Sequence, residues 1–171
     1  MPNIASRKLT HAALIAAVYV LLTVLFSAFS FGSIQFRIAE ALTLLPILTP
    51  AAIPGLFVGC LLANLLGGGV WFDIAVGSLA TLLAAVIARR LRKHPILAAA
   101  APVLLNGVMV GPVVYLAYVR SPGSPVMWSV LTGVMGSVAL GEAAVCYTLG
   151  LLLLAALKRF SRNDSLFFKN S

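Results

Sequence analysis

Long apolar runs separated by short polar segments dominate the pattern along the chain. Four apolar blocks stand out, at residues 9–31, 38–66, 72–88 and 96–157, and the last is interrupted by Arg120-Ser-Pro-Gly-Ser-Pro125. Crossing the hydrocarbon core of a bilayer takes roughly 20 helical residues, so each block is of spanning length. A Pro/Gly/Ser segment marks a turn, and it divides the last block into two helices. The pattern therefore predicts an all-α integral membrane protein.

The second block is expected to contain a break. Its length of about 29 residues would extend roughly 43 Å as one helix, and Pro46, Pro50 and Pro54 lie near its middle, where proline kinks or ends a helix. Basic residues beside apolar runs mark cytoplasmic loops, and here they gather at residues 7–8, 89–93 and 158–162. An even number of crossings must separate the first two groups. A hairpin of two short helices satisfies both conditions.

The predicted fold is a single domain, residues 1–160, that forms a bundle of six transmembrane helices with both termini in the cytoplasm. The second and third helices are too short to cross unaided, so neighbours are expected to screen them from lipid, or they are kinked. A short polar cytoplasmic tail is expected at 161–171. The expected spans are about 9–31, 38–49, 52–67, 72–90, 95–119 and 126–158.

Composition strengthens this prediction and excludes several functions. Hydrophobic residues make up 61% of the chain and charged residues 9%, against about 25% charged in soluble domains, and the mean hydropathy is +1.08. The net charge of +8 reports membrane orientation, because the basic residues cluster at helix ends, so lipid and not nucleic acid is the expected environment. We find no nucleotide-binding loop, metal-ligand spacing or nucleophile elbow in the sequence. The chain is therefore not expected to be an enzyme or to bind a metal, and energised transport would require partner subunits.

Small residues recur at four-residue spacing, which lets helix backbones approach closely in lipid. Internal packing is the expected role of such stripes in the third, fifth and sixth helices, which include Gly55/Gly59, Gly107/Gly111 and Gly133. The first helix differs, because two adjacent pairs form a wide alanine surface that is a candidate docking face for another subunit. These residues are Ala12, Ala13, Ala16 and Ala17.

Polar residues inside the predicted spans are the main functional candidates, because a charge at mid-bilayer costs about 2.5–3.5 kcal/mol on insertion scales. Glu142 has no basic neighbour nearby in the sequence, so either a ligand or an interhelical pair with Arg37 satisfies it. Asn106 lies beside Gly107, where a planar ligand could approach the backbone. An interhelical hydrogen bond is the alternative role of Asn106.

Further candidates lie at the predicted outer ends of the helices. Arg37 and Glu40 are three residues apart, so they either neutralise each other on one helix face or, with Gln35, belong to a loop that contacts a substrate. Trp71 and Asp73 either anchor and cap the fourth helix or stack on a ring and pair with a cation. Packing roles are expected for three more residues, namely Cys60, Asn64 and Cys146.

The segment Ile34-Gln-Phe-Arg-Ile-Ala-Glu-Ala-Leu-Thr-Leu-Leu-Pro46 closely resembles the one typical of the QueT family of queuosine-precursor transporters, within the S-components of energy-coupling factor (ECF) transporters. The resemblance extends over residues 9–157. It implies a substrate-binding subunit in the bacterial plasma membrane that captures a 7-deazaguanine, 7-aminomethyl-7-deazaguanine, from outside. It also implies docking through the alanine surface onto a transmembrane coupling subunit with two ATPase subunits. ATP is then used by the partners, and no cofactor is expected in this chain.

A ligand of this chemistry needs two carboxylates. Glu40 or Glu142 would accept hydrogen bonds from the guanine-like edge, and Asp73 or the remaining glutamate would pair with the aminomethyl cation. Asn106 would meet the carbonyl and ring nitrogen, and Trp71 would stack on the ring. Two other hypotheses stay open, an S-component for another small vitamin-like molecule and a structural or assembly protein whose buried charges pair with one another.

Overall fold

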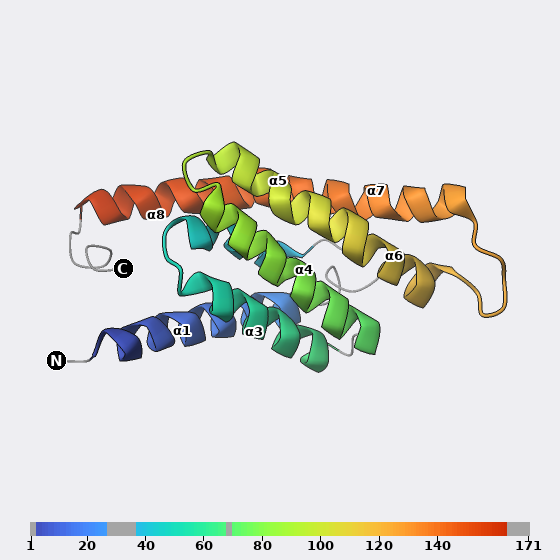
Figure 1. Cartoon of the computed structure of the whole chain (residues 1–171), viewed down its shortest axis with the longest axis horizontal. Coiled ribbons are helices and arrows are strands. Elements are labelled where there is room, and N and C mark those ends of the chain that lie inside the picture. Colours follow the sequence, from blue (N-terminus) through green and yellow to red (C-terminus); the bar gives the residue numbers. More distant parts are fainter. Residues whose placement is uncertain (1–2, 27–36, 68–69, 164–171) are drawn as a thin grey trace.

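The computed structural model describes residues 3–26, 37–67 and 70–163, and within these ranges every regular element is a helix. Four helices are long and apolar enough to cross a membrane, Ile4–Leu25 (α1), Trp71–Arg90 (α4), Pro95–Val119 and Trp128–Phe160. Two shorter apolar helices, Ile38–Ile47 (η1) and Ala52–Leu66 (α3), lie between α1 and α4 in the chain. The helices run side by side in an elongated bundle (Figure 1). The all-α prediction is confirmed, and so is the break in the second block.

The last two long helices are continuous but locally widened. The first contains α5 (Pro95–Leu105), η2 (Asn106–Val110), α6 (Gly111–Val114) and η3 (Tyr115–Val119), and the second contains α7 (Trp128–Ala144), η4 (Val145–Gly150) and α8 (Leu151–Asn163). The segments η2, η3 and η4 have π-helical hydrogen bonding. Such turns are rare and occur often at functional sites. The sequence pattern predicts the helices but gives no sign of the wider turns.

The helix η1 is a 3₁₀-helix, buried on nearly all sides. Pro46 lies inside it, and eight of its ten residues are buried. The guanidinium of Arg89 on α4 donates hydrogen bonds to the carbonyl oxygens of Pro46, at 3.0 Å, and Ile47, at 3.2 Å. These bonds satisfy carbonyl groups that a helix end leaves without an intrahelical partner. The expected screening from lipid is therefore confirmed for η1. Neighbouring helices screen only one side of α3, because Val58 and Leu62 on this helix are exposed.

Glycine residues allow two helix pairs to approach closely. A Cβ atom on Gly55 of α3 would lie 2.6 Å from the carbonyl oxygen of Ala12 on α1. A Cβ on Gly111 of α6 would lie 2.8 Å from the Cα of Met135 on α7. Internal packing thus explains the stripes on the third and fifth predicted helices. It does not explain Gly133 on α7, where an added Cβ would meet no described atom within 4 Å, so the packing prediction is wrong there.

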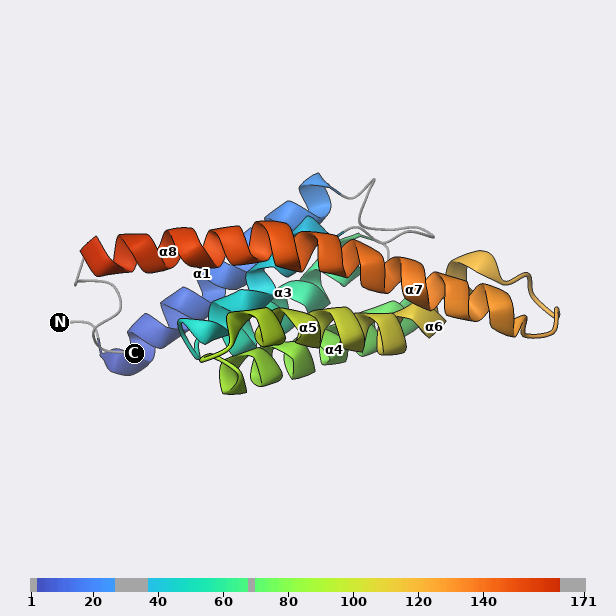
Figure 2. The same ribbon diagram turned by 90° about the horizontal axis from the view of Figure 1, so that it is seen from above.

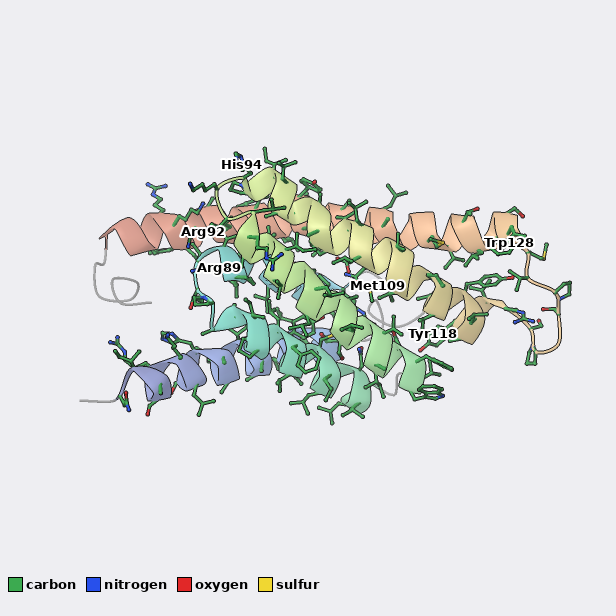
Figure 3. The ribbon with its side chains drawn as sticks, in the orientation of Figure 1. Arg89, Arg92, His94, Met109, Tyr118 and Trp128 are labelled. Carbon is green, nitrogen blue, oxygen red and sulfur yellow. The ribbon has the colours of Figure 1, made fainter. Side chains whose placement is uncertain are left out.

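Basic residues gather at one end of the bundle. Helix α1 begins and α8 ends at this end, as both views show (Figures 1 and 2). Arg89, Arg92 and His94, at the turn between α4 and α5, lie at the same end, whereas Tyr118 and Trp128 lie towards the other (Figure 3). The three basic groups of the sequence are thereby brought together in space.

Candidate functional site

Buried polar side chains from all the major helices meet inside the bundle. We call this set the buried polar cluster, and each member is at most 4% exposed. Placing such residues inside a membrane costs free energy, and they face the interior of the bundle. The members are Tyr19 of α1, Arg37, Glu40 and Thr43 at η1, Cys60 and Asn64 of α3, Asp73 and Thr81 of α4, Asn106 of η2, and Glu142 and Cys146 of the last long helix.

Glu40 lies at the centre of the cluster and is fully buried. The hydroxyl of Tyr19 donates a short hydrogen bond to its Oε1 atom, and the hydroxyl of Thr81 lies 3.5 Å from the same oxygen. The second oxygen, Oε2, has no hydrogen-bond partner within the described ranges. Leaving a buried polar atom without a partner costs about 1–3 kcal/mol, and more when the group is charged. An oxygen in this position is available to a ligand.

A salt bridge joins the beginning of η1 to α4. The Nη2 atom of Arg37 lies 3.3 Å from Oδ2 and 3.4 Å from Oδ1 of Asp73. The amide of Asn64 donates to the backbone oxygen of Asp73 at 3.3 Å, while its Oδ1 atom is buried with no hydrogen-bond partner in the described part of the chain. Gly77 leaves room for this group, because its Cβ would lie 3.2 Å from the Asn64 amide nitrogen. The observed ion pair thus crosses between helices and does not run along one turn of η1.

Glu142 and Asn106 form a second hydrogen-bonded pair. The Asn106 amide donates to Oε1 of Glu142 at 2.6 Å, which is the interhelical hydrogen bond that the sequence left as one of two possible roles. Cys146 links this pair to the backbone of the first glutamate, because its Sγ atom lies 3.7 Å from both Oε2 of Glu142 and the backbone oxygen of Glu40. Both glutamates therefore belong to one network.

The cluster contains more acidic than basic groups. The whole chain has four acidic residues, and three of them, Glu40, Asp73 and Glu142, are in the cluster. Its basic member is Arg37, and the undescribed segment 27–36 contains no Lys, Arg or His. Among the described residues, Arg37 pairs with Asp73 and no salt bridge to either glutamate is found. Such a site suits a ligand that carries a positive charge and hydrogen-bond donors.

The structure brings together five of the seven residues that the sequence suggested for ligand binding, namely Arg37, Glu40, Asp73, Asn106 and Glu142. Trp71 is not among them, since it is 66% exposed and stacks on Phe72, with the ring centroids 3.5 Å apart. The interfacial-anchor alternative fits Trp71 better. Asp73 does not cap α4, because Val70 is the N-cap residue and Asp73 lies in the first turn. Gln35 lies outside the described residues.

Sequence reasoning missed several members of the cluster. Cys60 packs in the apolar core as expected, but its sulfur also lies 3.4 Å from the hydroxyl of Thr81 and 3.6 Å from the amide of Asn64. Tyr19 was not singled out at all. One signal could have found it: Tyr19 lies three residues after Ala16 and seven after Ala12, so it shares their helix face.

The alanine surface of α1 is divided between the interior and the exterior. Ala12 and Ala16 are buried, the former against Gly55 and the latter against Gly59. Ala13 and Ala17 are exposed. They line an apolar groove on the outside of the bundle, which we call the α1–α3 groove, together with Ala16, Val20, Leu21, Val24, Val58, Leu62 and Leu66.

Comparison with known proteins identifies the family of the chain. The family model described as QueT transporter matches residues 9–159. This chain belongs to the QueT transporter family. The match includes most or all of each of the four candidate spans, so the protein is a multi-pass membrane protein of a transporter family.

A curated relative carries the same family name. The protein described as "Queuosine precursor transporter QueT" from Lactococcus lactis subsp. cremoris (strain MG1363) is 40% identical over 73 residues, which cover 42% of this chain and 43% of the relative. The chain thus matches less than half the length of this relative. No solved structure matches the chain significantly.

Proposed function

We propose that this protein is the substrate-binding subunit of an ECF-type importer and that it captures the queuosine precursor 7-aminomethyl-7-deazaguanine from outside the cell. The family and the name of the Lactococcus relative support a queuosine precursor as the transported molecule. The observation that carries the choice of a cationic precursor is the buried polar cluster, in which neither glutamate forms a salt bridge with another described residue.

The ligand would use the groups that the cluster leaves available. Its ring N–H and exocyclic amine form a donor edge that matches one carboxylate, and its aminomethyl group is an ammonium that matches another. Glu40 and Glu142 share these two roles, since Asp73 is paired with Arg37. Asn106, which already contacts Glu142, is positioned to meet the ring carbonyl. A site of this kind rejects analogues without the donor edge, because its own buried groups would be left unpaired.

The same proposal includes a membrane orientation. Six crossings with both termini in the cytoplasm of a bacterial plasma membrane fit the gathering of basic residues at one end of the bundle. Neither η1 nor α3 is long enough to cross a core of about 30 Å alone. In this orientation they form the short hairpin that makes the number of crossings even. The coupling subunit, which carries the two ATPases, would then dock on the α1–α3 groove through Ala13 and Ala17.

Binding to the purified full-length protein tests the substrate. We expect saturable binding of 7-aminomethyl-7-deazaguanine with thermal stabilisation, and weaker binding of adenine, which lacks the donor edge. Glu40→Gln and Glu142→Gln should each weaken binding by about 30-fold or more, since removing one charge of a buried pair costs about 2–5 kcal/mol. Arg92→Gln, which changes a charged residue at an exposed position outside the cluster, is the control and should bind normally.

Other outcomes would favour the competing hypotheses. Native mass spectrometry that finds a different small molecule on the gently purified protein would indicate another S-component substrate. A second outcome is that both Gln variants lose stability and that no deazaguanine raises the unfolding temperature of the unmodified protein. The buried charges would then serve structure alone.

The docking face has a separate test. Ala13→Trp and Ala17→Trp should prevent assembly with the coupling and ATPase subunits, because an indole would fill the groove between α1 and α3. Val18→Trp is the control, since Val18 is exposed on the same helix and does not line the groove. Normal assembly and ATP-dependent uptake in both Ala variants would contradict the docking role.

A further inference from the structure

The charge balance of the buried polar cluster constrains what happens when a cation enters it. We propose that ligand binding exchanges a proton: one of the two glutamates, Glu40 or Glu142, is a neutral carboxylic acid in the empty protein and releases its proton when the ligand ammonium binds. The inference rests on the proposed function, because it requires a cationic ligand at this site.

The first step of the argument is electrostatic neutrality. A lone carboxylate in a low-dielectric interior is so costly that the group is neutralised by protonation instead. Arg37 and Asp73 balance each other through their salt bridge. Residues 27–36, which precede η1 in the sequence and lie outside the described ranges, include no Lys, Arg or His. At least one of the two remaining carboxyl groups therefore holds a proton when no ligand is bound.

The second step is the set of groups that face the two glutamates. The carboxyl group of Glu40 faces Tyr19 from α1 and Thr81 from α4, and the thiol of Cys146 lies near its backbone oxygen. Glu142 faces the Asn106 amide and the thiol of Cys146. The titratable and charged groups around the pair are Arg37, Tyr19, Cys60 and Cys146, and the two glutamates also interact with each other. Arg37 is the one cation among them, and it already has a carboxylate partner.

The third step is the exchange itself. The empty protein holds R–COOH, and the ligand arrives as R′–NH₃⁺. Their product is the ion pair R–COO⁻ with R′–NH₃⁺, and the proton leaves to water, so atoms and charge balance with no other reactant. The charge inside the bundle rises by one when the ammonium enters and falls by one when the proton leaves. The cluster therefore has the same net charge before and after binding.

Proton linkage gives the sign of the pH effect. A proton and the ammonium compete for the same carboxylate, so raising the pH favours the ligand. The Kd of 7-aminomethyl-7-deazaguanine should therefore fall as the pH rises, by at most about tenfold per pH unit for the release of one proton. The Kd of 7-cyano-7-deazaguanine, which has the same guanine-like edge and no ammonium, should change less with pH.

Isothermal titration calorimetry on the full-length protein in detergent measures the exchange directly. Repeating the titration in buffers of different ionisation enthalpy gives the number of protons released, and we expect about one more for the aminomethyl than for the cyano ligand. One of the two glutamates pairs with the ammonium, and its variant, Glu40→Gln or Glu142→Gln, should lose this extra proton. The same variant should still bind the cyano ligand, which shows that it is folded. Arg92→Gln, at an exposed position, should release protons normally.

The outcomes separate the two proposals. Binding of the aminomethyl ligand with no extra proton and no pH dependence overturns the exchange and leaves the proposed function standing. Extra proton release that persists in both Gln variants also overturns it, because the proton then comes from elsewhere. If neither deazaguanine binds the unmodified protein, the proposed function and the exchange both fail.

Discussion

The close contact between α1 and α3 gives a sharp prediction about stability. In Gly55→Ala the new Cβ would lie 2.6 Å from the Ala12 carbonyl oxygen and 3.1 Å from the Ile15 Cβ. Ordinary contacts are about 3.5 Å, so α1 must move outward by roughly 0.9 Å. Overpacking of this kind costs about 1–3 kcal/mol, and the higher helix propensity of alanine returns about 1 kcal/mol. We expect a net loss of up to about 2 kcal/mol in the free energy of unfolding.

The chain supplies a matched control for this change. An added Cβ on Gly133 would meet no described atom within 4 Å, so Gly133→Ala should keep only the propensity gain of about 1 kcal/mol. Both variants are compared by thermal unfolding in one detergent and by ligand affinity. Because α1 also holds Tyr19 against Glu40, only Gly55→Ala should weaken ligand binding. Equal stability and equal affinity in the two variants would refute the packing argument.

Three further changes test individual contacts. Tyr19→Phe removes the hydroxyl that donates to Glu40 and should lower ligand affinity by about 5–30-fold, measured by calorimetry; an unchanged Kd would show that this hydroxyl does not prepare the site. Trp71→Ala should leave the Kd within about twofold, because the indole is 66% exposed and lies outside the cluster; a large loss would restore the stacking role. Arg89→Gln removes bonds to the end of η1 and should cost about 1–3 kcal/mol in unfolding experiments, whereas Arg92→Gln, at an exposed position, should be neutral.

The helices were readable from the sequence because lipid imposes a simple length and polarity requirement on each span. The hairpin between η1 and α3 followed from prolines and from the distribution of basic residues. That η1 is a 3₁₀-helix did not follow, because this geometry depends on tertiary contacts such as the guanidinium of Arg89 at its end. The π-helical turns were missed for a related reason, since no residue type specifies them.

Residues of the candidate site could be predicted where placing the side chain in lipid without a partner costs free energy. Glu40, Asn106 and Glu142 could be selected because a buried polar group needs a partner. Tyr19 and Cys60 carry no such cost, so their part in the cluster depends on which helix faces meet. Trp71 shows the opposite case, because an aromatic residue close in sequence to a buried polar one can itself be largely exposed. The rotation of a helix about its own axis is what the pattern leaves undetermined.

Helix α1 has two faces with different surroundings, and this arrangement has a thermodynamic consequence. One face packs Ala12 and Ala16 against α3 and extends to the Tyr19 hydroxyl on Glu40. The other face presents Ala13 and Ala17 to the exterior. If α1 can occupy two positions, a partner that binds its outer face and prefers one position changes the affinity for the ligand inside the bundle. The ligand then changes the affinity for the partner by the same factor. A single helix would then suffice to make the two binding events reciprocal, with no relay through the rest of the bundle.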